Sequence, residues 1–131
     1  MITLKAHFDS RKHKDVRTVD LDGAGTLHEV LKRASKVLRG ANYSTPETIQ
    51  RFPRNLDAFI EYVEDWIVTN LGSSLAVKFD GVESLLKENP VAYLAIISAI
   101  HSAECNILED RLLAGNLNVL DDLSKLAILV G

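Results

Sequence analysis

The feature that most constrains this 131-residue chain is an alternation of short apolar runs with longer segments of helical periodicity. Strand-like runs occupy 16–21, 75–79 and 126–130. The segments between them carry apolar residues three and four positions apart, which is typical of helices with one buried face. Strands that are separated by helices pair in parallel, because the helix returns the chain across the sheet. This order predicts an α/β domain in which a small parallel sheet is packed with helices.

The starts of three helices are marked in the sequence. Thr26 and Glu29 have the spacing of a capping box, in which each side chain bonds the other residue's backbone N–H. Asn55 is a good N-cap for a second helix that extends to about residue 67. A third, strongly apolar helix is predicted from Pro90 to Leu113. The residues that mark its apolar side are Val91, Leu94, Ile97 and His101.

The N-terminal segment adds a strand to this pattern. Apolar and polar residues alternate from Ile2 to Phe8, and a polar break over 9–15 leads into the strand at 16–21. Two strands joined by a polar tip predict a β-hairpin. A short helical turn is also expected at Thr45-Pro46, where proline would take the first helical position.

Length and composition favour one cytoplasmic domain over residues 1–131. Cys105 is the only cysteine, so a disulfide framework is excluded, and this residue is expected to be a small buried hydrophobe. The longest apolar stretch, 91–100, is too short to span a bilayer and is interpreted as a buried helix. We therefore expect no association with membranes.

The sequence contains no constellation typical of catalysis, and we predict that the protein is not an enzyme. The four histidines lack metal-ligand spacing, and no glycine-rich phosphate loop is present, so neither a metal nor a cofactor is expected. The basic cluster 11–14 is interpreted as a solvated hairpin tip, which argues against direct nucleic-acid binding. Asp57 and Glu61 resemble a glycosidase pair only in spacing, since no apolar enclosure would separate their pKa values.

Charge is distributed unevenly along the chain. Up to Gly40 the net charge is +4, from nine Lys/Arg against five Asp/Glu, and from Ala41 onward it is −7, from six against thirteen. No Lys or Arg occurs between Asn55 and Val77. Helical spacing gathers acids on the side of the second helix opposite its apolar face. These acids are Asp57, Glu61, Glu64 and Asp65. An acidic surface attracts basic proteins.

The segment from Phe52 to Glu61 resembles the motif that opens the inhibitory helix of the barstar family, roughly Tyr-Tyr-Gly-x-Asn-Leu-Asp-Ala-Leu-Trp-Asp. The shared core is Asn-Leu-Asp-Ala, while Pro53 replaces the motif glycine and Ile60 stands where tryptophan is usual. The segments upstream, 19–23 and 26–31, look like the family's first strand and first helix. The resemblance implies a barstar-like domain, from which this chain departs by an extra N-terminal strand and an extended C-terminal helical region.

The resemblance also implies a function. Barstar-like proteins block the active sites of cytotoxic ribonucleases, so an immunity or antitoxin role is expected. The expected partner is a basic ribonuclease or another toxin, which this protein would bind as a monomer in a 1:1 complex. The implied partner-binding residues are Asn55, Asp57, Ile60 and Glu61, and helix spacing adds Glu64. A further family acid lies on the last helix, where Glu104 could take its place. The alternative is a non-toxin interaction protein or phage-type assembly factor that uses Val91–Leu113 as its interface.

Overall fold

The computed structural model describes residues 1–38 and 55–131. Four strands of this described part form one sheet in the order β1-β4-β3-β2, and all three pairings are parallel. The strands are β1 (Ile2–Leu4), β2 (Asp15–Asp20), β3 (Leu75–Asp80) and β4 (Ala127–Val130). Val77 pairs with Arg17 on one side and with Ile128 on the other, so β3 lies inside the sheet. The α/β class and the small parallel sheet are as predicted.

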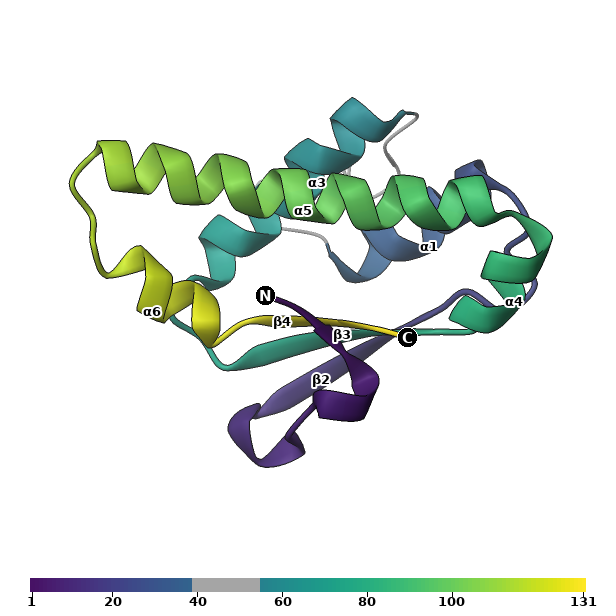
Figure 1. The fold of residues 1–131 in the computed structure, drawn as a ribbon, viewed down its shortest axis with the longest axis horizontal. Helices are drawn as coiled ribbons and strands as arrows, with labels where there is room; N and C mark the ends of the chain where they lie inside the picture. The colour runs from purple at the N-terminus through teal and green to yellow at the C-terminus, as the bar shows by residue number, and fades with distance from the viewer. Residues whose placement is uncertain (39–54) are drawn as a thin grey trace.

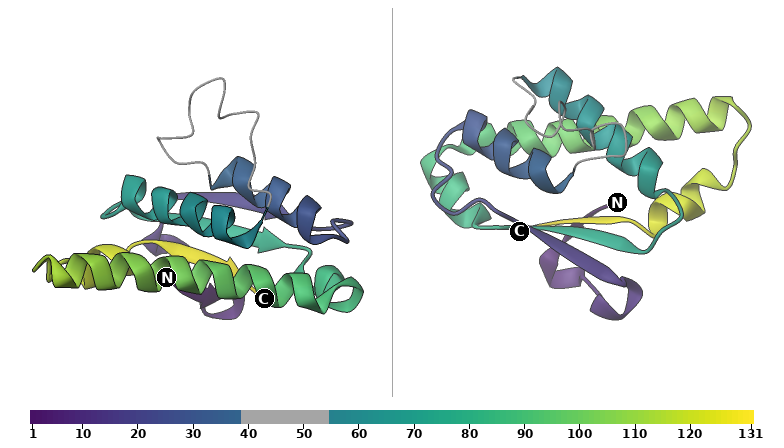
Figure 2. Two further views of the ribbon diagram at one scale, coloured as in Figure 1. Left: turned by 90° about the horizontal axis from the view of Figure 1, so that it is seen from above. Right: turned by 180° about the vertical axis from the view of Figure 1, so that it is seen from behind.

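Three long helices cover one face of the sheet (Figures 1 and 2). They are α1 (Leu27–Val37), α3 (Leu56–Asn70) and α5 (Pro90–Leu113), and two short helices are α4 (Val82–Glu88) and α6 (Val119–Ser124). α3 packs mainly against α5 and also contacts α1. The core lies between these helices and the sheet, where Phe59, Phe79 and Ile100 are fully buried. α4 lies just before Pro90 and buries Val82 and Leu85.

The predicted N-terminal hairpin is wrong. β1 pairs with β4, and β2 pairs with β3, so the two segments lie at opposite edges of the sheet. Between them the chain forms two single 3-10 turns, Lys5–His7 and Ser10–Lys12, on the sheet face opposite the helices (Figure 1). Phe8 packs there against a small cluster of Ala76, Ala127 and Leu129. A hydrogen bond from Lys5 Nζ to Asp80 Oδ1 (2.6 Å) lowers the pKa of the Asp80 carboxyl and joins this segment to β3.

The predicted capping box is half formed. Thr26 Oγ1 accepts a hydrogen bond from the backbone N–H of Glu29 (3.2 Å), as expected. The Glu29 carboxylate does not return the bond and instead pairs with Arg33 Nε one turn later (3.1 Å). Arg33 also donates to the backbone carbonyls of Asp20 and Asp22. The reciprocal bond is missing because the backbone N–H of Thr26 donates to the carbonyl of Ala24 instead. Arg33 joins α1 to the end of β2.

α5 has the predicted bounds but presents a different face to the core. Val91 and Leu94 are 74% and 62% exposed, and His101 is exposed as well. The buried side is formed instead by Ala92, Ile96, Ala99, Ile100, Ala103 and Ile107. Since the first half of α5 is apolar on nearly all sides, its sequence period could not select the face that meets the sheet.

α5 also meets the length and composition that a membrane-crossing helix requires, alone among the described helices. The prediction concerned only the ten-residue stretch 91–100, whereas the helix that contains it has 24 residues. Only 28% of its most apolar window is buried, so α5 is less buried than predicted. Core helices of globular proteins meet the same requirement. In this structure α5 packs against α3, α4 and α6, and its buried side belongs to the main core.

Candidate protein-binding surface on α3

α3 begins at the residue that the sequence predicts. Asn55 Oδ1 accepts a hydrogen bond from the backbone N–H of Ala58 (2.8 Å), so this side chain caps the helix. The cap fixes where the first turn begins and therefore the direction in which each later side chain points. The rest of the family-like motif, Phe52-Pro53-Arg54, and the predicted turn at Thr45-Pro46 lie outside the described residues.

The buried side of α3 is wider than its apolar spacing predicts. The residues expected there are Leu56, Phe59, Ile60, Val63 and Ile67. Phe59, Val63 and Ile67 are fully buried, whereas Leu56 and Ile60 are half-buried. Tyr62 and Trp66 are buried too, because α3 contacts α5 and also α1. This packing buries one side of α3 and leaves in solvent a strip of the other side, which also contains Val68.

That strip carries the acidic residues, and we call Asp57, Glu61 and Glu64 the acidic stripe. Asp57 and Glu61 are one turn apart and exposed, and Glu64 is half-buried. Ile60 precedes Glu64 by one turn and lies at the margin of the stripe. The structure thus places Asp57, Ile60, Glu61 and Glu64 on one side of α3, whereas Asn55 caps the start of the helix. Asp65, also expected on this side, is half-buried, so the most accessible charges belong to Asp57 and Glu61.

The described residues do not neutralise the exposed end of the stripe. No ion pair within 1–38 and 55–131 involves Asp57 or Glu61, and no basic residue occurs between Asn55 and Val77. Asp57 is stabilised by its place in the first helical turn, near the positive end of the helix dipole, whereas Glu61 is too far along to benefit. Their negative charge is therefore available to a partner.

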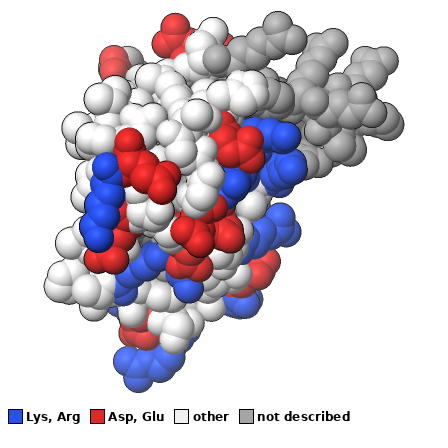
Figure 3. All heavy atoms as spheres, turned by 90° about the vertical axis from the view of Figure 1, so that its right-hand side faces the viewer, with Lys and Arg blue, Asp and Glu red and all other residues white. Residues whose placement is uncertain are grey.

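The charge pattern differs at the end of the molecule that carries α4. Figure 3 views this end, and acidic and basic side chains lie next to one another there. The Arg33–Glu29 pair on α1 (3.1 Å) is an example of local charge compensation. Three pockets outlined by described residues also lie away from the stripe, beside β2 or the N-terminal segment. The stripe is a helix ridge, which suits insertion into a concave partner site.

Two residues of α5, Asn106 and Glu104, bear on the extent of the acidic stripe: the first contacts it and the second does not. Asn106 Nδ2 donates a hydrogen bond to Glu64 Oε1 (2.8 Å), which fixes the orientation of that carboxylate. Glu104, the predicted further acid, has its Oε1 3.2 Å from the amino nitrogen of Met1. Side chains two positions apart on a helix are rotated by about 200° around its axis, so they point in nearly opposite directions. Glu104 therefore faces away from α3. No pattern in the sequence indicated that Asn106 would contact Glu64.

The described residues present no metal-binding cluster. No group of three or more His, Cys, Asp or Glu within 1–38 and 55–131 is arranged to hold a metal ion. Cys105 is exposed, which contradicts its predicted burial, and its Sγ lies 3.6 Å from Nε2 of His101 one turn earlier. Both residues lie on the solvent side of α5, because the helix buries its alanine and isoleucine side instead.

Comparison with known proteins places this chain in no family. No protein-family model, no curated protein and no solved structure matches it. The case for a function therefore depends on the residues of α3 and on the resemblance of its first turn to the inhibitory helix of the barstar family.

Proposed function

We propose that this protein is an inhibitor of the immunity or antitoxin type, which blocks the active site of a basic cytotoxic ribonuclease or a related toxin. The observation that carries the proposal is the pair of exposed carboxylates, Asp57 and Glu61, one turn apart on a helix whose opposite side is buried. Asn55 holds the start of that helix, and Ile60 and Glu64 border the charges.

The chemistry of the target explains why such a stripe would inhibit it. A ribonuclease active site is positively charged, because it binds phosphates and stabilises the charge that develops on them. Carboxylates held at helical spacing can pair with arginine and lysine there and exclude the substrate. Opposite charges also accelerate encounter, which matters when the target is toxic to the cell that makes it.

The order of the elements supports the proposal. β2, α1, α3 and β3 follow one another in the order that the resemblance leads us to expect, and α5 and β4 follow the second of these strands. β1 is an additional strand at the other edge of the sheet. We propose a single barstar-like domain that acts in the cytoplasm as a monomer, without a cofactor, in a 1:1 complex and without direct contact with nucleic acid.

A pull-down from extract of the native host tests the proposal. The baits are the wild type, the double variant Asp57→Lys/Glu61→Lys and the control Glu83→Lys/Glu88→Lys. Both variants change the net charge equally, but the control alters exposed residues of α4. We expect the wild type and the control to capture a small basic toxin and the stripe variant to bind it at least about a hundredfold more weakly. Capture of the same partner by all three baits would show that the stripe is not the binding surface.

A second function is favoured by a different surface. Val91 and Leu94 are the most exposed apolar residues of the first turns of α5, and His101 and Cys105 lie on the same exposed side. Exposed apolar strips mark protein interfaces. If Val91→Lys/Leu94→Lys abolishes capture while the stripe variant does not, the partner binds through α5. A captured partner that is not a toxin then identifies a non-toxin interaction or assembly factor.

A further inference from the structure

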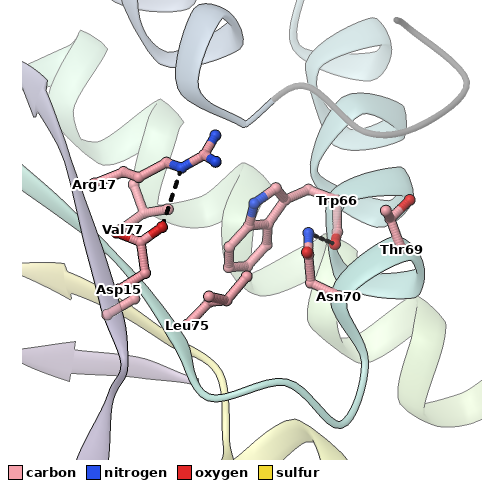
Figure 4. Close-up of a pocket in the computed structure, with 8 residues that line it drawn as sticks. Asp15, Arg17, Trp66, Thr69, Asn70, Leu75 and Val77 are labelled. Atoms are coloured by element: carbon pink, nitrogen blue, oxygen red, sulfur yellow. Dashed lines mark hydrogen bonds and ion pairs between the residues drawn. The ribbon is translucent and has the colours of Figure 1, made fainter.

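A separate pocket lies on the other side of α3 from the acidic stripe. Figure 4 shows it between the C-terminal half of α3 and the first halves of β2 and β3. Its volume is about 140 Å³. A cavity of about 150 Å³ holds a benzene ring, so this pocket admits a group the size of one amino-acid side chain.

One wall of the pocket is apolar. Trp66, Leu75 and Val77 line it, and Trp66 is only 4% exposed. Trp66 and Asp57 are nine positions apart, which places them on opposite sides of the helix. The pocket is therefore independent of the proposed inhibitory surface, and an apolar ligand body can lie against the indole.

The other wall carries unused hydrogen-bond donors. The Arg17 guanidinium extends from β2 over the pocket, and the edge of the Trp66 indole that carries its nitrogen is turned toward it (Figure 4). Arg17 Nε lies 3.6 Å from Asp15 Oδ2, which is an ion pair beyond hydrogen-bonding distance. Among the described residues, neither Nη group of Arg17 nor the indole N–H has an acceptor. Two donors thus converge on a small space beside an apolar surface.

We propose that this pocket binds a carboxylate on a short apolar body, with Arg17 holding the carboxylate and Trp66 contacting the rest. The planar guanidinium fork matches the two oxygens of a carboxylate. A phosphate dianion is a poorer fit, because a single arginine faces it and the charge of Asp15 lies at the same wall. The carboxylate comes either from a free small acid or from an acidic side chain of another protein.

Trp66 is the only tryptophan of the chain, so its signals report directly on the pocket. The probes are 3-methylbutanoate and its uncharged amide, together with acetyl-Ala-Glu-Ala-amide and the matching glutamine peptide. Fluorescence emission and the indole N–H resonance of Trp66 are followed during titration. We expect each acid to bind at least about tenfold more tightly than its amide, and the tighter acid identifies the source of the ligand.

Variants assign the effect to Arg17. Arg17 is 66% exposed, so Arg17→Gln should fold normally and should weaken acid binding at least about tenfold. Arg11→Gln is the matched control, because Arg11 is an exposed arginine of the N-terminal segment with its own acidic neighbour, Asp9. Asp57→Lys/Glu61→Lys should leave the titration unchanged, which separates this test from that of the inhibitory surface. Absence of any shift with both acids up to about 50 mM, equal binding of acid and amide, or full binding by Arg17→Gln would overturn the proposal.

Discussion

Both ring nitrogens of His13 are buried without a hydrogen-bond partner in the described part of the chain. The ring lies beside Phe8, with 5.2 Å between the ring centroids. A buried polar group that makes no hydrogen bond costs free energy relative to an apolar group of the same size. The residue belongs to the segment that the sequence predicts as a solvated hairpin tip, so its burial is a finding of the tertiary structure.

We therefore predict that His13→Phe raises the free energy of unfolding by about 1 kcal/mol. Urea denaturation of the two proteins measures the difference. His101→Phe is the control, because His101 is exposed and its replacement should change stability by less than about 0.5 kcal/mol. A loss of stability in His13→Phe would show that the ring nitrogens are needed where they lie.

Residue-scale features were predictable where both partners lie within one helical turn. The caps at Thr26 and Asn55 involve residues three positions apart, and both are confirmed. Features with a distant partner were not predictable. Asn106 bonds Glu64 across 42 positions of sequence, and no local pattern marks such a pair.

At the scale of elements, the start of α4 depends on one glycine. Gly81 has φ of 77° and is the N-cap of α4. A Cβ at this position would lie 2.5 Å from the backbone nitrogen of Asp22, so the turn after β2 and the start of α4 approach each other too closely for any side chain. The sequence shows a glycine here but not the neighbour that requires it.

Gly81→Ala is expected to lower the free energy of unfolding by about 3 kcal/mol, from left-handed backbone strain together with the clash. Gly23→Ala is the matched control, because Gly23 has φ of 71° and a Cβ added there would meet nothing within 4 Å. It should lose only about 1 kcal/mol. Equal losses in chemical denaturation would show that the close approach to Asp22 contributes nothing.

The helices and strands themselves were predicted well, but the strand pairing and the side of α5 that packs against the core were not. α1, α3, α5 and the three main strands occur within a few residues of the predicted bounds, because their periods and caps are local. The prediction of a hairpin was wrong because alternation identifies a strand without identifying the strand that pairs with it. The prediction of the buried side of α5 was wrong because the sequence of a helix that is apolar on most sides does not indicate which side is buried.

At the scale of the whole molecule, the described elements share one main core. Residues from β2, α1, α3, β3, α5 and β4 belong to the same buried cluster. Trp66 is part of this cluster and lies beside β2 and β3. A core shared among so many elements favours cooperative unfolding of the chain as a single domain.

We predict that urea unfolding followed by Trp66 fluorescence coincides with unfolding followed by far-ultraviolet circular dichroism. The first signal reports on the core around one side chain, and the second on all helices together. Two separated transitions would show that part of the chain unfolds independently and would contradict the prediction of one domain over residues 1–131.

The sequence by itself determined the α/β class, the approximate bounds of the main helices and strands, and the concentration of acids on the helix that begins after Asn55. Each of these depends on residues a few positions apart, which interact in almost any surroundings. The tertiary structure decided the strand order, the burial of His13, the exposed side of α5 and the meeting of Arg17 with Trp66. These depend on which distant segments pack together, because a period of two or of 3.6 residues sets a face but does not select what covers it.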